Sequence, residues 1–347
     1  MNYDEVTIKG KEELREKIQE LYGLDIADAI CSFSTRNFSF IFSEGCRPVV
    51  LRVSIDPLRT REDVLSELMW VDDLREQIPN IAQMIPNSAG HIAEEFDISG
   101  QHIMVCQFRK LSGAFPTPDV RDEAFFREVG TLLGRIHRVS CEEQSSGFKF
   151  KRKRWTEMPG FNPQILAEAI DDKAAAKMTE LMDELEQLPE EPQSFGMIHS
   201  DFVVQNMFVD WDVVSLFDFD DCCYGYYLYD IAEIMLSCMS PDYKPMMNRL
   251  EMYDWILGIL REAYEKEHHL PDDQWARIPR VMALRAGQIC VHLVLQKDAF
   301  PPDKWPQFFQ HMSSTFAGAD DFLVHYEQGM APIRQYMMAQ MQSRSNS

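Results

Sequence analysis

The first hundred residues contain short apolar runs that predict strands around one helix. Residues 37–42 alternate, so that Phe38, Phe40 and Phe42 share one face, and residues 43–46 supply a turn. Over 61–77 the apolar residues recur at helical spacing instead. Further runs predict strands at 49–53, 92–96 and 102–108. This order predicts a small antiparallel sheet with one helix packed on it.

Beyond residues 110–113 the pattern changes to the period of amphipathic helices. The predicted helices cover residues 123–139, 163–188, 228–239, 245–266, 273–297 and 319–341. A compact island of strands and loops lies among them at 195–219. We therefore expect an α+β chain of two lobes: a sheet lobe over 1–108 and a mostly helical lobe over 109–347, with the hinge near 107–113.

The charge balance and the length of the apolar runs argue against two classes of partner. The chain has 347 residues, of which 45% are hydrophobic, and a formal net charge of −22. Binding to nucleic acid needs clustered Lys and Arg, and the one basic run, 151–154, is short and is expected to be a solvated edge. No apolar run reaches the roughly 18 residues of a membrane span. We expect neither nucleic acid nor membrane as a partner, and the acidic surface weakly favours cationic substrates.

The N-terminal residues and the cysteines predict a cytoplasmic protein. Residues 1–20 are polar and acidic, unlike a signal peptide. The eight cysteines show no C-x-x-C spacing, so reduced thiols are expected.

Three polar residues stand out in the apolar stretch 197–221, namely Asp201, Asn206 and Asp218. Phosphoryl transfer needs a carboxylate that orients the attacking hydroxyl and accepts its proton. It also needs oxygen ligands that hold Mg²⁺ against the nucleotide phosphates. An H-x-D-x-x-x-x-N loop followed by a strand that ends in Asp supplies all of these groups. The apolar stretches 207–209 and 213–217 would pair as a hairpin that brings Asn206 and Asp218 to the same end.

These residues lie in motifs whose order resembles one family. His199-Ser200-Asp201 with Asn206 is similar to the catalytic loop of the protein-kinase-like fold in its aminoglycoside phosphotransferase version. Phe217-Asp218-Phe219 is similar to the I-D-F segment of that family, and the run from Gly225 to Asp230-Ile231-Ala232 resembles its G-x-x-x-x-D-L-A segment. The resemblance extends, more weakly, from about Ile26 to the C-terminal helices.

The resemblance implies a fold and a reaction. The fold is the protein-kinase-like two-lobe fold, shared with choline-kinase-like and homoserine-kinase-like enzymes. The reaction is the transfer of the γ-phosphate of ATP to a hydroxyl of a small molecule. By the resemblance, Asp201 is the catalytic base, Asn206 and Asp218 ligate Mg²⁺, and Asp230 is structural. His199 braces the loop through hydrogen bonds and takes no chemical step.

Other interpretations of the same residues stay open. Asp and Asn are common in tight turns, so a structural role is one alternative. Asp218-Phe219-Asp220 also resembles the D-x-D nucleophile motif of haloacid-dehalogenase-type phosphatases. However, Cys222 stands where that motif has Thr or Val, and the motif normally opens its domain. The alternative functions are a catalytically inactive nucleotide- or metabolite-binding module of the same fold and a bacterial protein Ser/Thr kinase.

A nucleotide site is expected in the sheet lobe. Kinase-like folds hold the phosphates with a strand Lys that is paired to a helix Glu. Arg52 stands at the place of that Lys, as in many sequences that resemble this family, and its planar fork suits phosphate oxygens. Glu67 is the expected partner because it shares a helix stripe with Val71 and Leu74. Glu62 is the alternative partner, and a surface position is the alternative for both acids.

The loop over the phosphates is expected at 32–37, which lacks the glycines of a backbone cradle. Ser34, Thr35 and Asn37 are the candidate side-chain donors. The adenine is expected against the hinge near Gln107 and Phe108, held by backbone groups.

The phosphate acceptor is expected to be small. Only eleven residues separate Asp218 from Asp230, too few for the activation segment with which a protein kinase binds a peptide. Asp220, Asp221 and Trp155, together with 245–300, are expected to lie near the acceptor. Acidic residues there would suit an amine-bearing molecule such as an aminoglycoside, choline or ethanolamine, while homoserine-like and sugar acceptors stay open.

Overall fold

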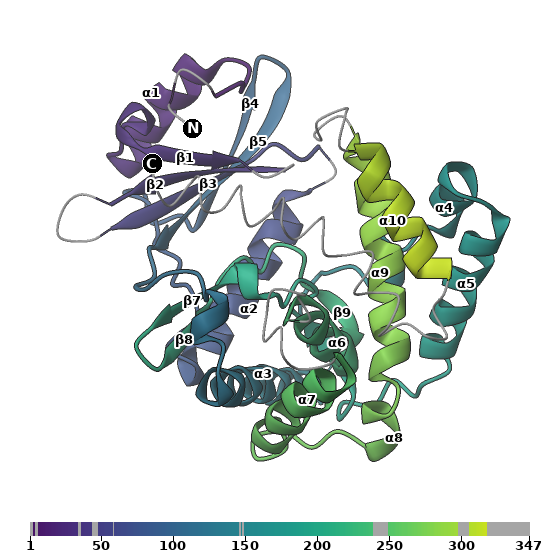
Figure 1. Cartoon of the computed structure of the whole chain (residues 1–347). Helices are drawn as coiled ribbons and strands as arrows, with labels where there is room; N and C mark the ends of the chain where they lie inside the picture. Colours follow the sequence, from purple (N-terminus) through teal and green to yellow (C-terminus); the bar gives the residue numbers. More distant parts are fainter. Residues whose placement is uncertain are drawn as a thin grey trace. The chain divides into compact units, whose positions relative to one another are not determined.

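The computed structural model describes residues 3, 6–33, 36–43, 48–57, 59–145, 147, 149–238, 249–297 and 305–317 (Figure 1). The chain divides into two compact units. The first, here called the sheet unit, comprises Met1–Ala114, Phe148–Arg152 and Phe208–Asp220. The second, the helical unit, comprises Phe115–Gly147, Lys153–Met207 and Asp221–Ser347.

The sheet unit is built on a five-stranded antiparallel sheet in the order β1-β2-β3-β5-β4. The strands are β1 (Ile30–Phe33), β2 (Asn37–Phe42), β3 (Val49–Ser54), β4 (Ala93–Ile98) and β5 (Gln101–Arg109). Four of them confirm the strands predicted from alternating apolar residues. Strand β1, which has only four residues and lies at the edge of the sheet, has no counterpart among the predicted strands.

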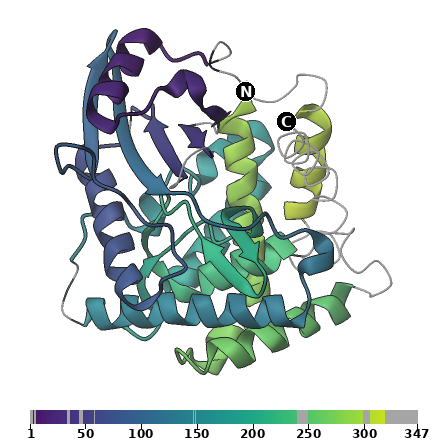
Figure 2. The same cartoon turned by 90° about the vertical axis from the view of Figure 1, so that its left-hand side faces the viewer.

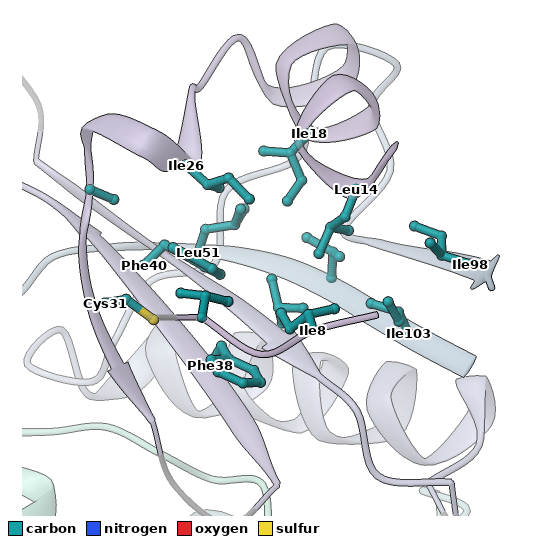
Figure 3. Close-up of a cluster of buried hydrophobic side chains, with 14 residues drawn as sticks. Ile8, Leu14, Ile18, Ile26, Cys31, Phe38, Phe40, Leu51, Ile98 and Ile103 are labelled. Carbon is teal, nitrogen blue, oxygen red and sulfur yellow. The ribbon is translucent and has the colours of Figure 1, made fainter. Parts of the chain in front are cut away.

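One face of the sheet is covered by the N-terminal part of the chain. Helix α1 (Lys11–Tyr22) and the 3₁₀ helix η2 (Ile26–Asp28) pack on a buried apolar cluster (Figure 3). Leu14 and Ile18 of α1 contribute to this cluster, and Phe38 and Phe40 of β2 enter it from the sheet. The shared face predicted for the β2 phenylalanines is therefore confirmed. Helix α1 itself was not predicted, because its apolar stripe is narrow.

Helix α2 (Arg61–Gln77) has the predicted bounds. It packs on strand side chains that do not belong to the first apolar cluster. It begins with a capping box, in which Thr60 and Asp63 satisfy each other's backbone N–H groups. Val64 and Leu68 of α2 form a second apolar cluster with Met104 and Cys106 of β5. Side chains alternate across a strand, so β5 contributes Ile103 and Val105 to the first cluster and Met104 and Cys106 to the second.

A hairpin of strands β7 (Met207–Asp210) and β8 (Val213–Leu216) confirms the predicted pairing in the island at 195–219. All of it except Met207 belongs to the sheet unit. The N–H of Leu216 donates to the carbonyl of Asn80 at 3.0 Å, and the N–H of Ala82 donates to the carbonyl of Leu216 at 3.0 Å. The end of β8 is thereby fixed to the segment that follows α2.

The helical unit packs long helices around a short two-stranded sheet. Its helices are α3 (Glu123–Gln144), α4 (Pro163–Ala169), α5 (Asp172–Glu186), α6 (Tyr227–Cys238), α7 (Arg249–Tyr264), α8 (Asp272–Trp275), α9 (Ile278–Leu295) and α10 (Trp305–Ala317). Strand β6 (Phe195–Ile198) pairs with β9 (Cys223–Tyr226). Figure 2 shows α3 lying along α7. Gly130 permits this approach, because a Cβ there would meet the carbonyl oxygen of Leu260 at 2.5 Å.

Several predicted helix bounds were wrong. The stretch 163–188 forms two helices, because Asp171 is extended and its side chain caps α5 at the N–H of Ala174. The stretch 273–297 is likewise divided into α8 and α9. Helix α10 was not predicted, and the helix predicted at 319–341 lies outside the described residues. Shorter 3₁₀ helices occur at η3 (Pro118–Val120), η4 (Trp155–Glu157) and η5 (Val204–Asn206).

Among the described residues, α9 is the one helix that is long and apolar enough to cross a membrane. It was not predicted as such from the apolar runs of the sequence. Within the structure 67% of this helix is buried, and it packs on α6. Burial of this kind is typical of a core helix.

Candidate active site

Asp201 lies in the loop that follows β6 in the helical unit, with two side chains fixing its carboxylate. Its Oδ1 accepts a hydrogen bond from Nη2 of Arg285 at 2.8 Å. Its Oδ2 accepts one from Nδ2 of Asn206 at 2.8 Å. The Asp201 side chain is nevertheless 33% exposed. A fixed and accessible carboxylate of this kind can orient a hydroxyl and take its proton.

The loop backbone around Asp201 is anchored by Asp230. The Asp230 carboxylate, fully buried on α6, accepts from the N–H groups of His199 and Ser200, both at 2.8 Å. Ser200 has a φ of 62°, a left-handed conformation that these bonds maintain. Nδ1 of His199 accepts from the N–H of Asp201 at 3.3 Å. These contacts are those of loop anchors, the roles expected for Asp230 and His199.

Arg285 and Glu233 were missed by the sequence analysis. Glu233 accepts from the N–H of Phe202 at 2.7 Å, and its Oε1 lies 3.1 Å from Nε of Arg285. Burial raises the pKa of Glu233 well above its ordinary value; Arg285 opposes the shift, while Asp230 and Asp201 add to it. The available signal was an Arg that directly follows the apolar run Val281–Leu284 within the stretch that forms α9.

Asn206 ends η5 and is buried. Its Nδ2 donates to the backbone carbonyl of Asp201 at 2.9 Å as well as to the Asp201 carboxylate. Because the amide nitrogen is used in this way, the Oδ1 atom of Asn206 is the oxygen that can ligate a cation.

Asp218 follows β8 in the sheet unit and has a φ of 67°. Asp tolerates this left-handed conformation better than most residues. Its side chain is 40% exposed, and its Oδ1 lies 3.9 Å from Nη1 of Arg52. The next residue, Phe219, packs edge-to-face on Trp70 of α2 with ring centroids 5.6 Å apart. The carboxylate of Asp218 therefore follows a firmly packed strand and reaches solvent.

Among the described residues, no group of three His, Cys, Asp or Glu side chains could hold a metal ion. Magnesium sites in nucleotide enzymes do not require such a group, because water and phosphate oxygens complete the coordination around one or two protein ligands. The amide oxygen of Asn206 and the carboxylate of Asp218 are hard oxygen donors of the required kind. The donor chemistry of each residue thus fits magnesium.

Arg52 and Glu67 form a buried ion pair in the sheet unit. Nη1 and Nη2 of Arg52 donate to the two oxygens of Glu67 at 2.7 and 2.8 Å. The guanidinium also lies 5.3 Å from the ring centroid of Phe108. Burial alone would lower the pKa of Arg52, but Cys106 and the acids Glu67 and Asp220 raise it well above its ordinary value. Glu62, the alternative partner, is exposed and pairs with Lys151.

The residues expected to contact the rest of the nucleotide are less suitably placed. Ser34 and Thr35 lie outside the described residues. The Nδ2 atom of Asn37 donates to Oδ2 of Asp220 at 2.7 Å, so this donor is already used within the protein. Gln107 is buried inside β5, and its carbonyl accepts from the N–H of Ile85 at 2.8 Å. One lone pair of this carbonyl is therefore already used within the sheet unit.

Asp220 is part of a buried cluster of charges, contrary to the expectation that it lies near the acceptor. Its carboxylate accepts from Nη1 of Arg59 at 3.1 Å, and Arg36 lies 3.9 Å away. Its backbone carbonyl accepts from Arg59 and, at 2.7 Å, from Nη2 of Arg152. Although burial would raise the pKa of Asp220, Arg59, Arg36 and Arg52 lower it below the ordinary value. An acid that is neutralised in this way cannot attract a cationic substrate.

One further expectation about this region was wrong, and another holds only in part. Trp155 is buried and packs on Phe161 and Tyr226, so it does not present an aromatic surface. The basic run at 151–154 is only partly a solvated edge, because Arg152 donates to Asp220 and to the carbonyl of Asp63.

Comparison with known proteins decides the family. The sequence model of the phosphotransferase enzyme family (APH) matches residues 32–266, more than half of the chain. The chain belongs to the APH phosphotransferase family. It is accordingly a small-molecule kinase that uses ATP.

The relatives described here are small-molecule kinases by name. Amicoumacin kinase of Bacillus subtilis (strain 168) is 23% identical over 251 residues, which cover 72% of this chain and 74% of that protein. The structure of amicoumacin kinase hAmiN, solved with AMP-PNP, Ca²⁺ and Ami, superposes with a TM-score of 0.80 at 20% identity, covering 88% of this chain and 93% of the other. A microcompartment-associated aminopropanol kinase gives a TM-score of 0.70 at 20% identity, covering 91% and 99%.

These similarities confirm the kinase-like fold that the motifs implied. The haloacid-dehalogenase interpretation of Asp218-Phe219-Asp220 was wrong, because the fold is kinase-like and Asp220 is buried in ion pairs.

Proposed function

We propose that this APH kinase transfers the γ-phosphate of ATP to a hydroxyl of a small, amine-bearing molecule, with Asp201 as the catalytic base. The observation that carries the proposal is the state of the Asp201 carboxylate. Arg285 and Asn206 each fix one of its oxygens, yet a third of the side chain is accessible. A second lone pair on either oxygen can accept the proton of an incoming hydroxyl.

Two acidic side chains of α6 support this assignment. Asp230 and Glu233 hold the loop through the N–H groups of His199, Ser200 and Phe202. Because these hydrogen bonds hold the loop backbone, Asp201 keeps its position in the absence of substrate. Such preorganisation lowers the cost of orienting the attacking group.

Asn206 and Asp218 are proposed as the protein ligands of magnesium. The ion would neutralise charge on the β- and γ-phosphates when it is bound. Asn206 is prepared for this role because its amide nitrogen is used by Asp201, which leaves Oδ1 for the cation. Asp218 contributes an accessible carboxylate at the end of β8.

Arg52 is proposed to bind the nucleotide phosphates, with Glu67 as its positioning partner. The ion pair with Glu67 fixes the plane of the Arg52 guanidinium. The guanidinium also lies 3.9 Å from the carboxylate of Asp218, a proposed metal ligand. Gln107 and Asn37 are assigned structural roles instead, on the contacts described above. Ser34 remains a candidate phosphate donor.

The class of acceptor rests on chemistry and on the relatives. The names of two relatives give amicoumacin and aminopropanol as their acceptors. A net charge of −22 favours the approach of a cationic molecule. We therefore propose an amino-alcohol or an amine-bearing antibiotic as the acceptor.

A panel assay tests this function. ATP consumption with Mg²⁺ is measured with ethanolamine, aminopropanol, kanamycin, amicoumacin, glucose and casein as separate acceptors. Stimulation by one amine-bearing hydroxyl compound, with a phosphorylated product detected by mass spectrometry, is the expected result. Stimulation by casein alone would identify a protein kinase. ATP binding without turnover for any acceptor would favour the inactive binding module.

A further inference from the structure

We propose that Arg285 is a positioning residue that holds the Asp201 carboxylate in its catalytic orientation. This proposal rests on the proposed function of Asp201. The two residues are 84 positions apart in the sequence, and neither the motif around Asp201 nor the comparisons assign a role to Arg285.

The guanidinium of Arg285 is fixed by groups other than Asp201. It projects from α9, and its side chain is only 11% exposed. Nε lies 3.1 Å from Oε1 of Glu233, and Nη1 donates to Oε1 of Gln288. The hydroxyl of Tyr229 donates to the same Gln288 oxygen. Because these neighbours determine where the guanidinium lies, Nη2 can impose a position on Asp201.

The arrangement of charges also requires a cation at this place. Three carboxylates lie close together at the catalytic loop, those of Asp201, Asp230 and Glu233, and the side chains of Asp230 and Glu233 are fully buried. Backbone N–H groups stabilise Asp230, whereas Arg285 contacts both Asp201 and Glu233. Removing one partner from a buried ion pair leaves an uncompensated charge. Arg285 therefore supplies the compensating positive charge, and its contact with Glu233 holds the guanidinium in place.

The second hydrogen bond to Asp201 explains why the effect concerns catalysis and not only folding. Asn206 fixes Oδ2, and Arg285 fixes Oδ1. With both oxygens fixed, the carboxylate plane cannot rotate about the Cβ–Cγ bond. Without Arg285, the group is free to turn about its remaining hydrogen bond, and a misplacement of about 1 Å can lower a rate by about 100-fold.

The test compares variants of the full chain in the assay described above, with the panel acceptor that gives the highest turnover. Arg285→Met removes the guanidinium, and Arg285→Met with Glu233→Gln also removes the carboxylate that would otherwise be stranded. Arg280→Met is the matched control, because Arg280 lies on the same helix and pairs with Glu180 and Glu184 near the surface. Calorimetric titration with Mg-ATP gives the fraction of competent protein.

We expect kcat per competent site to fall about 100-fold in both Arg285 variants, while the KM for ATP stays within about twofold of the parent. Arg285→Lys should recover part of the loss, because it restores the charge without the fork. Added guanidinium ion, kept below denaturing concentrations, should partly rescue Arg285→Ala and should not rescue Asp201→Asn.

Two results separate failure of this proposal from failure of the proposed function. If Asp201→Asn loses turnover but Arg285→Met and the double variant stay within about threefold of Arg280→Met, the positioning role is wrong. If Asp201→Asn itself keeps its turnover, the proposed base is wrong and this inference falls with it. Should Arg285→Met fail to fold, the double variant decides: unchanged kcat per competent site in it overturns the proposal.

Discussion

The guanidinium of Arg52 donates to both oxygens of the Glu67 carboxylate, at 2.7 and 2.8 Å, and both side chains are buried. Arg52 stands on β3 between Leu51 and Val53, whose side chains enter the apolar cluster on the other face of the sheet. A buried guanidinium is costly unless it is paired. Glu67 meets that requirement, and its bidentate contact fixes the plane in which Arg52 presents its remaining donors.

The pair should behave as one unit in nucleotide binding. Arg52→Ala and Glu67→Ala are each expected to raise the KM for ATP about tenfold or more, because the phosphates lose a charge-assisted contact or its orientation. The double variant should cost clearly less than the sum of the two single changes. Steady-state kinetics over a range of ATP concentrations, with the four proteins of the cycle, measures both effects.

Glu62→Ala is the matched control for this cycle. Glu62 lies on the same helix but is exposed and pairs with Lys151 at the surface. Its removal should leave the KM for ATP unchanged. Additive effects of Arg52→Ala and Glu67→Ala, with unaltered ATP affinity in the former, would instead assign phosphate binding to the loop that contains Ser34.

The sequence predicted those parts of the fold whose apolar pattern is regular. The bounds of β2 and α2 agree with the structure because Phe38 and Phe40, and Val64 and Leu68, repeat with the period of their element. The division between α4 and α5 was missed because a single residue, Asp171, ends one helix pattern and caps the next. A single capping residue of this kind is a weak sequence signal within a long amphipathic pattern.

The motif residues of the candidate site were identified from the sequence, but the residues that contact them were not. Asp201 and Asn206 are five positions apart, so a motif relates them directly. The contacts from Arg285 to Asp201 and from Arg59 to Asp220 join residues 84 and 161 positions apart, and only the tertiary fold brings them together. Asn37 and Asp220 were expected to face ligands for the same reason, because the sequence does not show their long-range contacts.

Asp218 is expected to act on the metal complex of the nucleotide. Asp218→Ala should weaken binding of Mg-ATP by about tenfold or more, while binding of ATP in the presence of a chelator stays nearly unchanged, because the lost group is an oxygen ligand. Isothermal titration calorimetry with and without Mg²⁺ measures the difference. Equal Mg-ATP affinities of the parent and the variant would remove Asp218 from the metal site.

The Arg59–Asp220 pair should contribute to stability. Arg59→Met leaves the buried Asp220 carboxylate without its nearest cation, and breaking such a pair costs about 3 kcal/mol or more. Urea denaturation should show this decrease in the free energy of unfolding. The surface variant Arg127→Met, which loses an exposed pair with Glu123, should change it far less, because exposed ion pairs contribute little to stability. Similar losses in the two variants would contradict a structural role for the Asp220 cluster.

His268 should make stability depend on pH. Burial lowers its pKa from 6.5 to about 4 in the native state. Between these two values the unfolded chain binds a proton that the native chain does not, so stability decreases as the pH falls from about 6.5 to 4. The loss amounts to roughly 3 kcal/mol, at about 1.4 kcal/mol for each pKa unit.

A substitution at His268 tests this pH dependence. His268→Gln keeps a donor toward the carbonyl of Gln193 but does not titrate. Unfolding followed from pH 7 to 4 should therefore show a shallower decline in the variant. His269→Gln, at the exposed neighbouring position, is the control and should decline as the parent does. Parallel curves for all three proteins would show that His268 does not contribute.

The central claim is that Asp201 is the base of a small-molecule kinase, and Asp201→Asn tests it most directly. The change preserves the shape of the side chain and can keep an oxygen toward Arg285, but it removes the proton acceptor. We expect kcat with the best acceptor to fall by about 100-fold to 10,000-fold, as for loss of a positioned base, with the affinity for Mg-ATP and the melting temperature close to those of the parent. Turnover by Asp201→Asn within about tenfold of the parent would contradict the account.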